Sequence, residues 1–388
     1  MKQYMRHVAF FFFLTVLALR PQAGLAEELT LQGRVVDAET GQPLPYVNIL
    51  VNDTVRTLTN IDGEFKLQAD EEARLTFSFI GYDKRKLLPK KLPEVIKLKP
   101  YATLMQEVMV SPMTQKELIG RIIDSLKTDY QEGKQWTRKY FFRALMEENT
   151  VSFVAEAFMT AHPVVNVRSA EVTSGLLGYD KSSGKEQMNI NSSNIHRLIE
   201  LAPKTYATTF WKPVVKPLSA LPTWEGFYKT KVETIRGEEG KDLYRITFSW
   251  RKSLLPMDYK RAHITGTAFV DAETCHLLRF DGAANNCKVR MGILSVPINI
   301  DFHLEYDYSR GVASVSNLAI HGSNDFLSYR VLLFALEGDK LDGDGTKASG
   351  PNIVTALKQA GYDESEWSKY DIIKRTRQEE ERVFGNVP

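Results

Sequence analysis

The sequence predicts a mainly β, α+β protein in which a small β-sandwich precedes a larger antiparallel-sheet domain with a packed amphipathic helix. Three observations support this fold class. Short alternating apolar segments, separated by turn residues, fill positions 31–82. One amphipathic helical segment begins at Thr114, and longer alternating segments follow it. The length and the hydrophobic content suit two globular domains. We expect them at 27–111 and 112–340, with a linker and C-terminal helices at 341–388.

The first 26 residues resemble a secretory signal peptide. Lys2 and Arg6 precede an apolar run over 8–19, and the small residues of 23–26 follow it. The run is shorter than the roughly 20 residues of a membrane span, although an uncleaved anchor is the alternative. We therefore expect export to the periplasm, with association with the outer membrane, and no transmembrane segment after cleavage.

The charge balance gives no sign of a nucleic-acid partner. The chain carries a net charge of +2, and residues 1–26 contribute three basic residues and no acidic one. The chain without its leader is therefore near −1. A nucleic-acid-binding domain would need a concentrated basic face.

The first domain is predicted strand by strand from alternation and turn chemistry. Residues 31–37 form the first strand, and the turn after Asp37 ends at Gly41, a residue that tolerates positive φ. A tight turn is expected at 60–63, and it competes with a calcium loop that would need more oxygen ligands than Asp62 offers. The alternating apolar positions of the later strands are Val47, Ile49, Val51, Phe65, Leu67, Leu75, Phe77 and Phe79.

The ordered motifs of this segment resemble the carboxypeptidase-like regulatory domain, a transthyretin-like β-sandwich common in exported proteins of Bacteroidetes. The residues that carry the resemblance are Gly33, Val35, Asp37, Thr40-Gly41, Pro43-Leu44, Val47-Asn48, Asp62-Gly63, Phe65 and Phe79-Ile80-Gly81-Tyr82. The resemblance covers about residues 30–110, with 104–110 as the closing strand. It implies an interaction module and no peptidase activity, since the same domain also precedes outer-membrane receptors and domains of unknown role.

The second domain begins with a predicted helix. Thr114 and Glu117 form a capping box. Behind it an apolar face at helical spacing indicates packing on a sheet, whereas a helix on a membrane surface would have a more basic polar face. The residues of the apolar face are Leu118, Ile119, Ile122, Ile123 and Leu126.

Alternating segments then predict an antiparallel meander with one buried and one wet face. A turn is expected at 281–286, and an insertion rich in Gly, Ser, Asn and Pro at 172–225. The predicted strands cover 136–145, 151–159, 244–250, 264–270, 275–280, 302–308, 314–320 and 326–334.

Residues 117–161 are also similar to a second module found behind this regulatory domain in Bacteroidetes. Phe141-Phe142-Arg143 matches its aromatic-aromatic-Arg signature, and Val154-Ala155-Glu156-Ala157 follows. The layout is similar to the curved half-barrels of periplasmic lipoprotein carriers, which is an analogy of fold only. The resemblance implies no assigned chemistry.

The C-terminal residues predict a linker and two helices. The linker covers 340–350, and its Asp and Gly residues lack the downstream Glu of a calcium loop. Pro351 suits the first position of a helix and Gly361 its end. A charged, solvated helix is expected over 370–384.

No motif assigns catalysis, a cofactor or a metal. The seven histidines show no metal-binding spacing, and Gly-x-Ser-x-Gly is absent. Alternation places His303 on the wet face of its strand, so we expect it to be exposed. Catalytic groups can lie far apart in sequence, so an enzyme is not excluded.

Four residues carry further predictions. Cys275 and Cys287 flank the predicted turn, so a hairpin disulfide and two buried thiols are both open interpretations. Thr54, within Asp53-Thr54-Val55, resembles the O-glycosylation acceptor of Bacteroidetes, and Ser125 lies in a second triplet of this kind.

The sequence therefore predicts a non-catalytic protein of the cell envelope. Its sandwich is expected to be an interaction module, and its second domain to bind an envelope protein or an apolar ligand. The alternative is a hydrolase with a dispersed site in the second domain.

Overall fold

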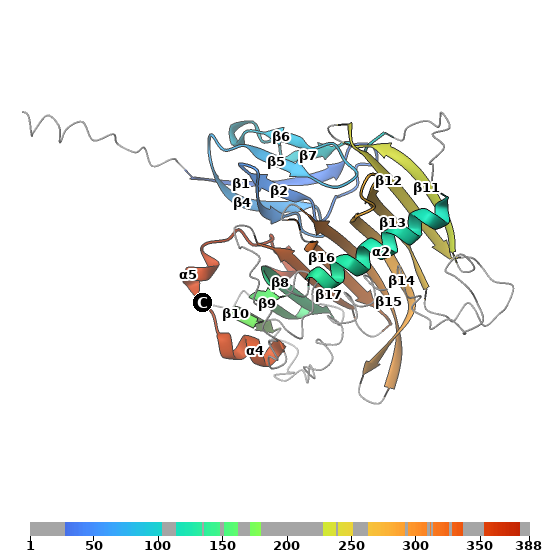
Figure 1. The fold of residues 1–388 in the computed structure, drawn as a ribbon. Coiled ribbons are helices and arrows are strands. Elements are labelled where there is room, and N and C mark those ends of the chain that lie inside the picture. The colour runs from blue at the N-terminus through green and yellow to red at the C-terminus, as the bar shows by residue number, and fades with distance from the viewer. Residues whose placement is uncertain are drawn as a thin grey trace, which may run out of the picture.

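The computed structural model describes residues 28–102, 114–133, 136–147, 151–161, 171–179, 228–237, 240–250, 263–291, 294–308, 311, 313–325, 328–336 and 353–380. A β-sandwich lies beside a large twisted sheet in this part of the chain (Figure 1). The predicted leader, the closing strand at 104–110 and the linker at 340–350 lie outside the described residues.

The N-terminal sandwich is formed as predicted. One sheet has the order β4-β1-β7, with β1 (Glu28–Asp37) between β4 (Glu64–Asp70) and β7 (Val95–Leu98). The other has the order β3-β2-β5-β6, built from β3 (Thr54–Leu58), β2 (Asn48–Val51), β5 (Leu75–Ser78) and β6 (Arg85–Leu87). A short 3-10 helix, η1 (Pro89–Lys91), connects β6 to β7. The alternating residues meet between the sheets, where Val35, Ile49, Phe65, Phe77 and Ile96 are fully buried.

The two predicted turns of the sandwich are present, and both depend on side-chain caps. Asp37 Oδ1 accepts hydrogen bonds from the backbone N–H groups of Glu39 and Thr40, each at 2.8 Å. Asn60 Oδ1 accepts from Asp62 and Glu64 at 3.0 and 2.9 Å. The second turn connects β3 and β4, which belong to different sheets, so it is not the turn of a hairpin.

The second part contains one antiparallel sheet of ten strands, in the order β10-β9-β8-β17-β16-β15-β14-β13-β12-β11. Consecutive strands are neighbours, with one exception: β10 and β11 lie at opposite edges of the sheet. In addition, β17 pairs with β8 and so joins the last strand to the first of this sheet. The strands are β8 (Arg138–Glu147), β9 (Val151–Ala161), β10 (Glu171–Tyr179), β11 (Tyr228–Arg236), β12 (Asp242–Trp250), β13 (His263–Asp271), β14 (Leu277–Met291), β15 (Leu294–Asp307), β16 (Ser314–Ser323) and β17 (Ser328–Ala335).

Helix α2 (Gln115–Gly133) packs on one face of this sheet, as predicted. The capping box is present, since Thr114 N donates to Glu117 Oε2 at 2.7 Å and Glu117 N donates to Thr114 Oγ1 at 3.3 Å. Leu118, Ile122 and Leu126 are at most 4% exposed and lie in one apolar cluster with residues of β8, β9 and β12–β17.

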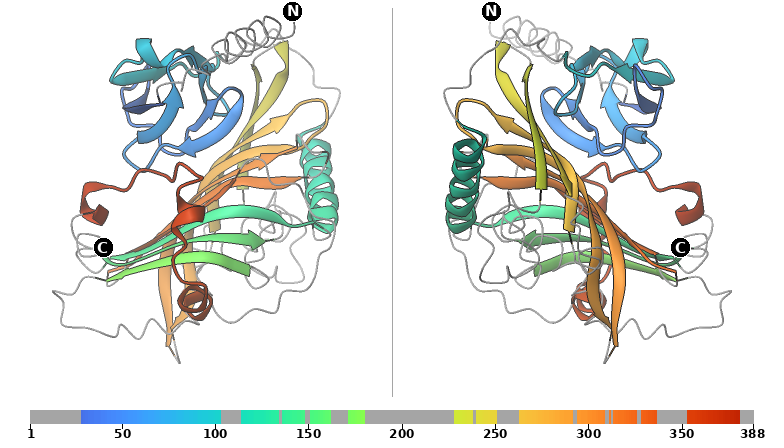
Figure 2. Two further views of the ribbon diagram at one scale, coloured as in Figure 1. Left: turned by 90° about the vertical axis from the view of Figure 1, so that its left-hand side faces the viewer. Right: turned by 90° about the vertical axis from the view of Figure 1, so that its right-hand side faces the viewer.

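The sandwich covers part of the opposite face. Figure 2 shows α2 and the sandwich on opposite sides of the sheet. A second apolar cluster forms here, and it joins Leu58 of the sandwich to Phe141, Phe158 and Phe334 of the sheet and to Ile373.

The C-terminal segment contains α4 (Ile353–Ala360), α5 (Glu364–Trp367) and the short α6 (Arg377–Glu379). Helix α4 ends as predicted, because Gly361 has φ +68° and its N–H donates to the carbonyl of Leu357. The prediction of a charged, solvated helix over 370–384 is wrong for the residues described. Positions 370–376 are not helical, and Ile373 and Glu379 are 1% and 3% exposed.

Two further predictions about the sheet need correction. The turn expected at 281–286 is absent, because β14 continues from Leu277 to Met291 with an irregular register between Ala284 and Cys287. The insertion expected from residue 172 does not include 172–179, because 171–179 form β10. Residues 180–227 lie outside the described residues. None of the described helices is both long and apolar enough to cross a membrane.

Candidate functional site: three polar clusters around the sheet

The first cluster lies where the sandwich meets the sheet. The register of β14 and β15 places Asp281 opposite His303 and Arg279 opposite Glu305. Asp281 contacts both basic groups, with Oδ1 2.5 Å from His303 Nδ1 and Oδ2 2.6 Å from Arg279 Nε. Burial raises the pKa of Asp281, but the charges of Arg279 and His303 outweigh it and hold the pKa at about 2.

The sandwich contributes aromatic and amide groups to the same cluster. The His303 ring stacks on Tyr46 and Phe79, with centroids 5.2 and 5.7 Å away. The Arg279 guanidinium lies 3.7 Å from the centre of the Phe79 ring. Asn48 Nδ2 donates to Glu305 Oε2 at 2.9 Å. The two parts are therefore joined by a buried polar and aromatic interface.

The prediction that His303 is exposed is wrong. Alternation assigns it correctly to the face opposite the apolar cluster of α2, but the sandwich covers that face and leaves His303 5% exposed. The sequence contains a signal for this cluster, since β14 and β15 each carry two charged or ionisable residues two positions apart. It does not show that a second domain docks on them.

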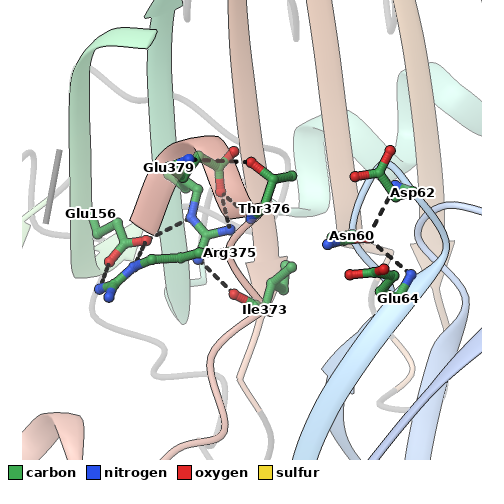
Figure 3. A network of polar contacts seen from close by, with 9 residues as sticks. Asn60, Asp62, Glu64, Glu156, Ile373, Arg375, Thr376 and Glu379 are labelled. Atoms are coloured by element: carbon green, nitrogen blue, oxygen red, sulfur yellow. Dashed lines mark hydrogen bonds and ion pairs between the residues drawn. The ribbon is translucent and has the colours of Figure 1, made fainter. Parts of the chain in front are cut away.

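The second cluster fixes the C-terminal segment (Figure 3). Glu156 of β9 is fully buried and contacts two arginines. Arg143 Nε donates to it at 2.7 Å, and Arg375 donates through Nε and a terminal nitrogen at 3.1 and 2.6 Å. Arg143 also donates to the carbonyl of Ile373 at 2.6 Å, and Glu379 Oε2 lies 3.7 Å from it. Burial raises the pKa of Glu156, but the two arginines lower it by more than burial raises it, so the pKa lies below its usual value.

Arg143 and Glu156, which lie in the two motifs predicted to resemble a second module, have a physical role in this structure. Arg143 and Glu156 stand opposite each other on β8 and β9. They form a buried ion pair, which Arg375 extends to a cluster of three charged groups. The sequence could not show this cluster, because Arg375 lies 219 residues beyond Glu156. We name Arg143, Glu156, Arg375 and Glu379 the tail clamp.

The tail also contacts the sandwich. Arg56 of β3 donates to Asp371 Oδ2 at 3.1 and 3.2 Å, and the backbone N–H of Gln68 donates to Asp371 Oδ1. Lys374 pairs with Glu64 of β4 at 2.8 Å. The residues after α5 therefore bind β3 and β4 of the sandwich and β8 and β9 of the sheet.

A cavity of about 190 Å³ lies beside this contact. It is lined by Thr54, Val55 and Arg56 of β3, by Leu336, and by Lys369, Tyr370 and Asp371 of the tail. The predicted glycosylation residue Thr54 is exposed at its rim, after Asn52 and Asp53, which both have positive φ.

The third cluster lies under α2 and contains a serine, a histidine and a carboxylate. Ser125 Oγ is 2.9 Å from His276 Nδ1, and Asp129 Oδ2 is 3.4 Å from the same nitrogen. The Tyr308 hydroxyl donates to Asp129 Oδ2 at 3.0 Å. Burial raises the pKa of Asp129, and its bonds to Tyr308 and His276 offset only part of that rise.

This arrangement differs from a catalytic triad. A triad uses both ring nitrogens, so that the carboxylate orients one while the other removes the nucleophile's proton. Here Ser125 and Asp129 both face Nδ1 of His276. A single nitrogen cannot donate to the carboxylate and accept from the serine at once, so the three groups do not form the relay of a triad.

The two cysteines are separated by most of the length of strand β14. Cys275 is a free thiol, 3% exposed, in the apolar cluster under α2. Cys287 lies ten residues beyond the start of β14, where it pairs with Ile298. Ten residues of strand span roughly 33 Å, so the hairpin disulfide is not formed in this structure. Among the described residues, no cluster of His, Cys, Asp and Glu could hold a metal ion.

Comparison with known families identifies the sandwich. Residues 31–110 match the model of the CarboxypepD_reg-like domain, so the predicted resemblance is confirmed and the sandwich is a domain of this kind. This domain is a non-catalytic module. Its motif residues serve turns and packing here, since the carboxylate of Asp37 caps a turn and accepts from the Tyr82 hydroxyl at 2.9 Å.

The chain is also similar to the TonB-dependent receptor SusC of Bacteroides thetaiotaomicron. The two are 36% identical over 86 residues, which are 22% of this chain and 8% of the receptor. The match supports a protein of the Bacteroidetes type, but the chain spans only a small fraction of the receptor.

Among solved structures, the chain is similar to an outer membrane lipoprotein-sorting protein domain from Vibrio parahaemolyticus. The identity is 8%, over 59% of this chain and 97% of that domain, with a TM-score of 0.21. A TM-score this low carries no argument about fold or function.

Proposed function

We propose that the chain is a non-catalytic protein of the cell envelope whose CarboxypepD_reg-like sandwich is an interaction module for an envelope protein. The observation that carries the proposal is the match of residues 31–110 to this module. The similarity of 86 residues of the chain to a TonB-dependent receptor of Bacteroides supports it. The buried interface around His303 supports it further. It fixes the sandwich on the sheet, so both parts present one preorganised surface to a partner.

The second domain contributes to partner binding in this proposal, rather than holding an apolar ligand. Ile246, Val270 and Ala284 lie on the apolar face of the ten-stranded sheet and are fully buried. Ile298, Ile300 and Leu304 on the same face are at most 4% exposed. Because the described part of this face is already covered, an apolar ligand would have to displace protein contacts. Native mass spectrometry after mild extraction is expected to show the mass of the protein without a bound lipid.

Photo-crosslinking in cells tests the interaction module. A photoreactive residue is placed at Glu39 or Ile61, both exposed on turns of the sandwich, and at Lys229 on edge strand β11 as the control. We expect light-dependent adducts with one envelope protein from the two sandwich positions and none from the control. Adducts of equal yield from all three positions, or none from the sandwich, would show that the module does not bind a specific partner.

The proposal also includes export and removal of the predicted leader. Fractionation of cells is expected to place the protein in the periplasmic or outer-membrane fraction, with Glu27 as the new N-terminus. A cytoplasmic protein that begins at Met1 would contradict this part of the proposal.

Glycosylation of Thr54 remains a prediction. Its hydroxyl is accessible at the start of β3, whereas Ser125 in the second triplet is half-buried and contacts His276. An intact mass above that of the unmodified chain, with the excess lost in Thr54→Ala and kept in Ser125→Ala, is the expected result. An unmodified mass would end this idea.

A further inference from the structure

The strongest charge asymmetry of the chain lies on the sandwich, between Asp83 and Lys99. This stretch contains seven basic residues and two acidic ones, a net charge of +5, although the whole chain carries only +2. It comprises β6, η1 and β7. We name it the basic edge. Its basic residues are Lys84, Arg85, Lys86, Lys90, Lys91, Lys97 and Lys99.

The fold keeps the basic edge accessible. β6 and β7 are the outermost strands of their sheets on one side of the sandwich. The edge strands of the other side, β3 and β4, contact the C-terminal tail through Arg56 and Glu64. Figure 1 shows β6 on the side of the sandwich away from the ten-stranded sheet. The two sides of the sandwich therefore differ, and only one of them is occupied by the described part of the tail.

Most cations of the basic edge are not neutralised by neighbours. Lys90 pairs with Glu71 at 2.8 Å, yet more than half of its side chain stays exposed. Lys86, Lys91, Lys97 and Lys99 are exposed, and none of these four forms an ion pair with another described residue. Arg34 of the adjacent strand β1 is a further exposed cation. It stands opposite Val95 in the register of β1 and β7.

Two large apolar side chains accompany these lysines. Leu88 and Val95 are 42% and 43% exposed, and they stand on either side of η1. Exposed apolar residues among lysines are typical of surfaces that rest on a lipid interface, where the chains enter the headgroup region and the cations remain with the phosphates.

The composition favours a lipid surface over an acidic protein. Protein interfaces are enriched in Tyr, Trp, Phe, Met and Arg and depleted in Lys. The basic edge contains six lysines, one arginine and no aromatic residue. Clusters of four to eight basic residues are attracted to anionic membranes, and each contributes about 1 kcal/mol near the surface, or about fivefold in affinity.

We propose that the basic edge docks the protein on an anionic membrane surface. Lys86, Lys91, Lys97 and Lys99 bind lipid phosphates, and Leu88 and Val95 enter the headgroup layer. This assignment is independent of the protein partner proposed above, because the crosslinking positions Glu39 and Ile61 lie outside the basic edge.

Vesicle sedimentation tests the proposal. The protein is purified after export, and intact mass confirms that the apolar leader is gone. Vesicles of phosphatidylcholine with about one third phosphatidylglycerol are compared with vesicles of phosphatidylcholine alone. We expect binding to the anionic vesicles only, with release when the salt rises from about 0.05 M to about 0.5 M, since salt screens exposed charges.

Two variants with the same change in charge locate the surface. Lys91→Gln/Lys97→Gln/Lys99→Gln is expected to weaken binding about 100-fold, from three lysines at about fivefold each. The control Lys229→Gln/Lys231→Gln/Lys241→Gln changes three exposed lysines around β11 and β12 and is expected to weaken it less than about threefold.

A third variant, Leu88→Ser/Val95→Thr, is expected to keep the salt dependence and bind more weakly. Circular dichroism confirms that each variant is folded. Equal binding of the two lysine variants, equal binding to both kinds of vesicle, or no binding at low salt would overturn the proposal. Failure to bind vesicles, together with loss of a crosslink to an acidic protein in the first variant, would assign the basic edge to a protein partner instead.

Discussion

Replacing Glu156 by Gln in the tail clamp should release the C-terminal tail. The substitution keeps the shape of the side chain and removes its charge. Arg143 is 3% exposed and, among the described residues, keeps only Glu379, at 3.7 Å, as an anionic partner. Arg375 loses one of its two oxygen acceptors and the negative charge of the other. The variant therefore leaves the buried positive charge of Arg143 without its closest negative charge. A buried charge without a counter-charge lowers stability strongly.

The expected magnitude follows from this burial. Removing one partner of a buried pair costs about 3–5 kcal/mol. The carbonyl of Ile373 still accepts from Arg143, and glutamine can still accept one hydrogen bond, so we expect the lower limit of about 3 kcal/mol. Local opening of the tail should become about 100-fold more frequent, since 1.4 kcal/mol is tenfold.

Hydrogen exchange at pH 7 measures this opening directly. The informative amides are those of Thr376, Glu379 and Glu380, which are hydrogen-bonded within the tail. We expect them to exchange about 100-fold faster in Glu156→Gln, while amides of the sandwich core keep their rates. The control is Glu233→Gln on β11, where a carboxylate paired with Lys231 and Arg245 is 18% exposed, and its loss should cost less than about 1 kcal/mol.

A second variant separates charge from packing. Arg143→Met/Glu156→Met removes the buried ion pair between β8 and β9, and apolar replacements of such a pair are often neutral, so much of the lost protection should return. An acceleration below about fivefold in Glu156→Gln, or one as large in the control, would refute the assignment of the tail clamp.

Three further predictions concern the other clusters. The carboxyl of Asp281 has a pKa lowered to about 2, so its stabilising contribution is complete above about pH 4 and is lost as the pH falls through 2. A third of its side chain is exposed, so Asp281→Asn should cost at most about 2 kcal/mol at pH 6, and the difference from the wild type in urea unfolding should shrink between about pH 4 and pH 2; a difference undiminished at pH 2 would contradict this view. Cys275 and Cys287 should both react with a thiol reagent in the unreduced, unfolded protein, and labelling that requires reductant would establish the bridge. A fluorophosphonate probe should leave Ser125 unlabelled, because His276 offers the same nitrogen to Ser125 and Asp129; labelling lost in Ser125→Ala would favour the hydrolase.

Local patterns were sufficient to predict most strands and the caps. Asp37 and Asn60 cap turns because their side chains reach backbone N–H groups two to four residues away. Thr114 and Glu117 begin α2 for the same reason. The apolar alternation of the sandwich also gave its core correctly. These features depend on residues that are close together in the sequence, so the sequence alone is enough to predict them.

The errors arise where a residue's surroundings come from distant parts of the chain. His303 has the alternation of an exposed residue, but Tyr46 and Phe79 cover it. Residues 370–379 have the composition of a solvated helix, but Arg375 and Glu379 pair with β8 and β9. The polar stretch at 281–286 is typical of a turn, yet pairing with β13 and β15 keeps it extended. In each case tertiary contacts override local propensity.

The tail clamp and the adjacent contacts of Asp371 and Lys374 have a consequence for biosynthesis. Arg56 and Asp371 are 315 positions apart, and Glu64 and Lys374 are 310 apart. The ribosome therefore completes the sandwich and all ten strands before it makes the tail residues that contact both parts. A chain that stops short of Asp371 leaves the buried Arg143–Glu156 pair without Arg375 and leaves the edges of β3 and β4 without the tail. Unprotected strand edges and incompletely paired charges are features that expose a protein to aggregation and proteolysis. Contacts of the tail with the sandwich and the sheet are therefore the last of the described contacts that the order of synthesis allows.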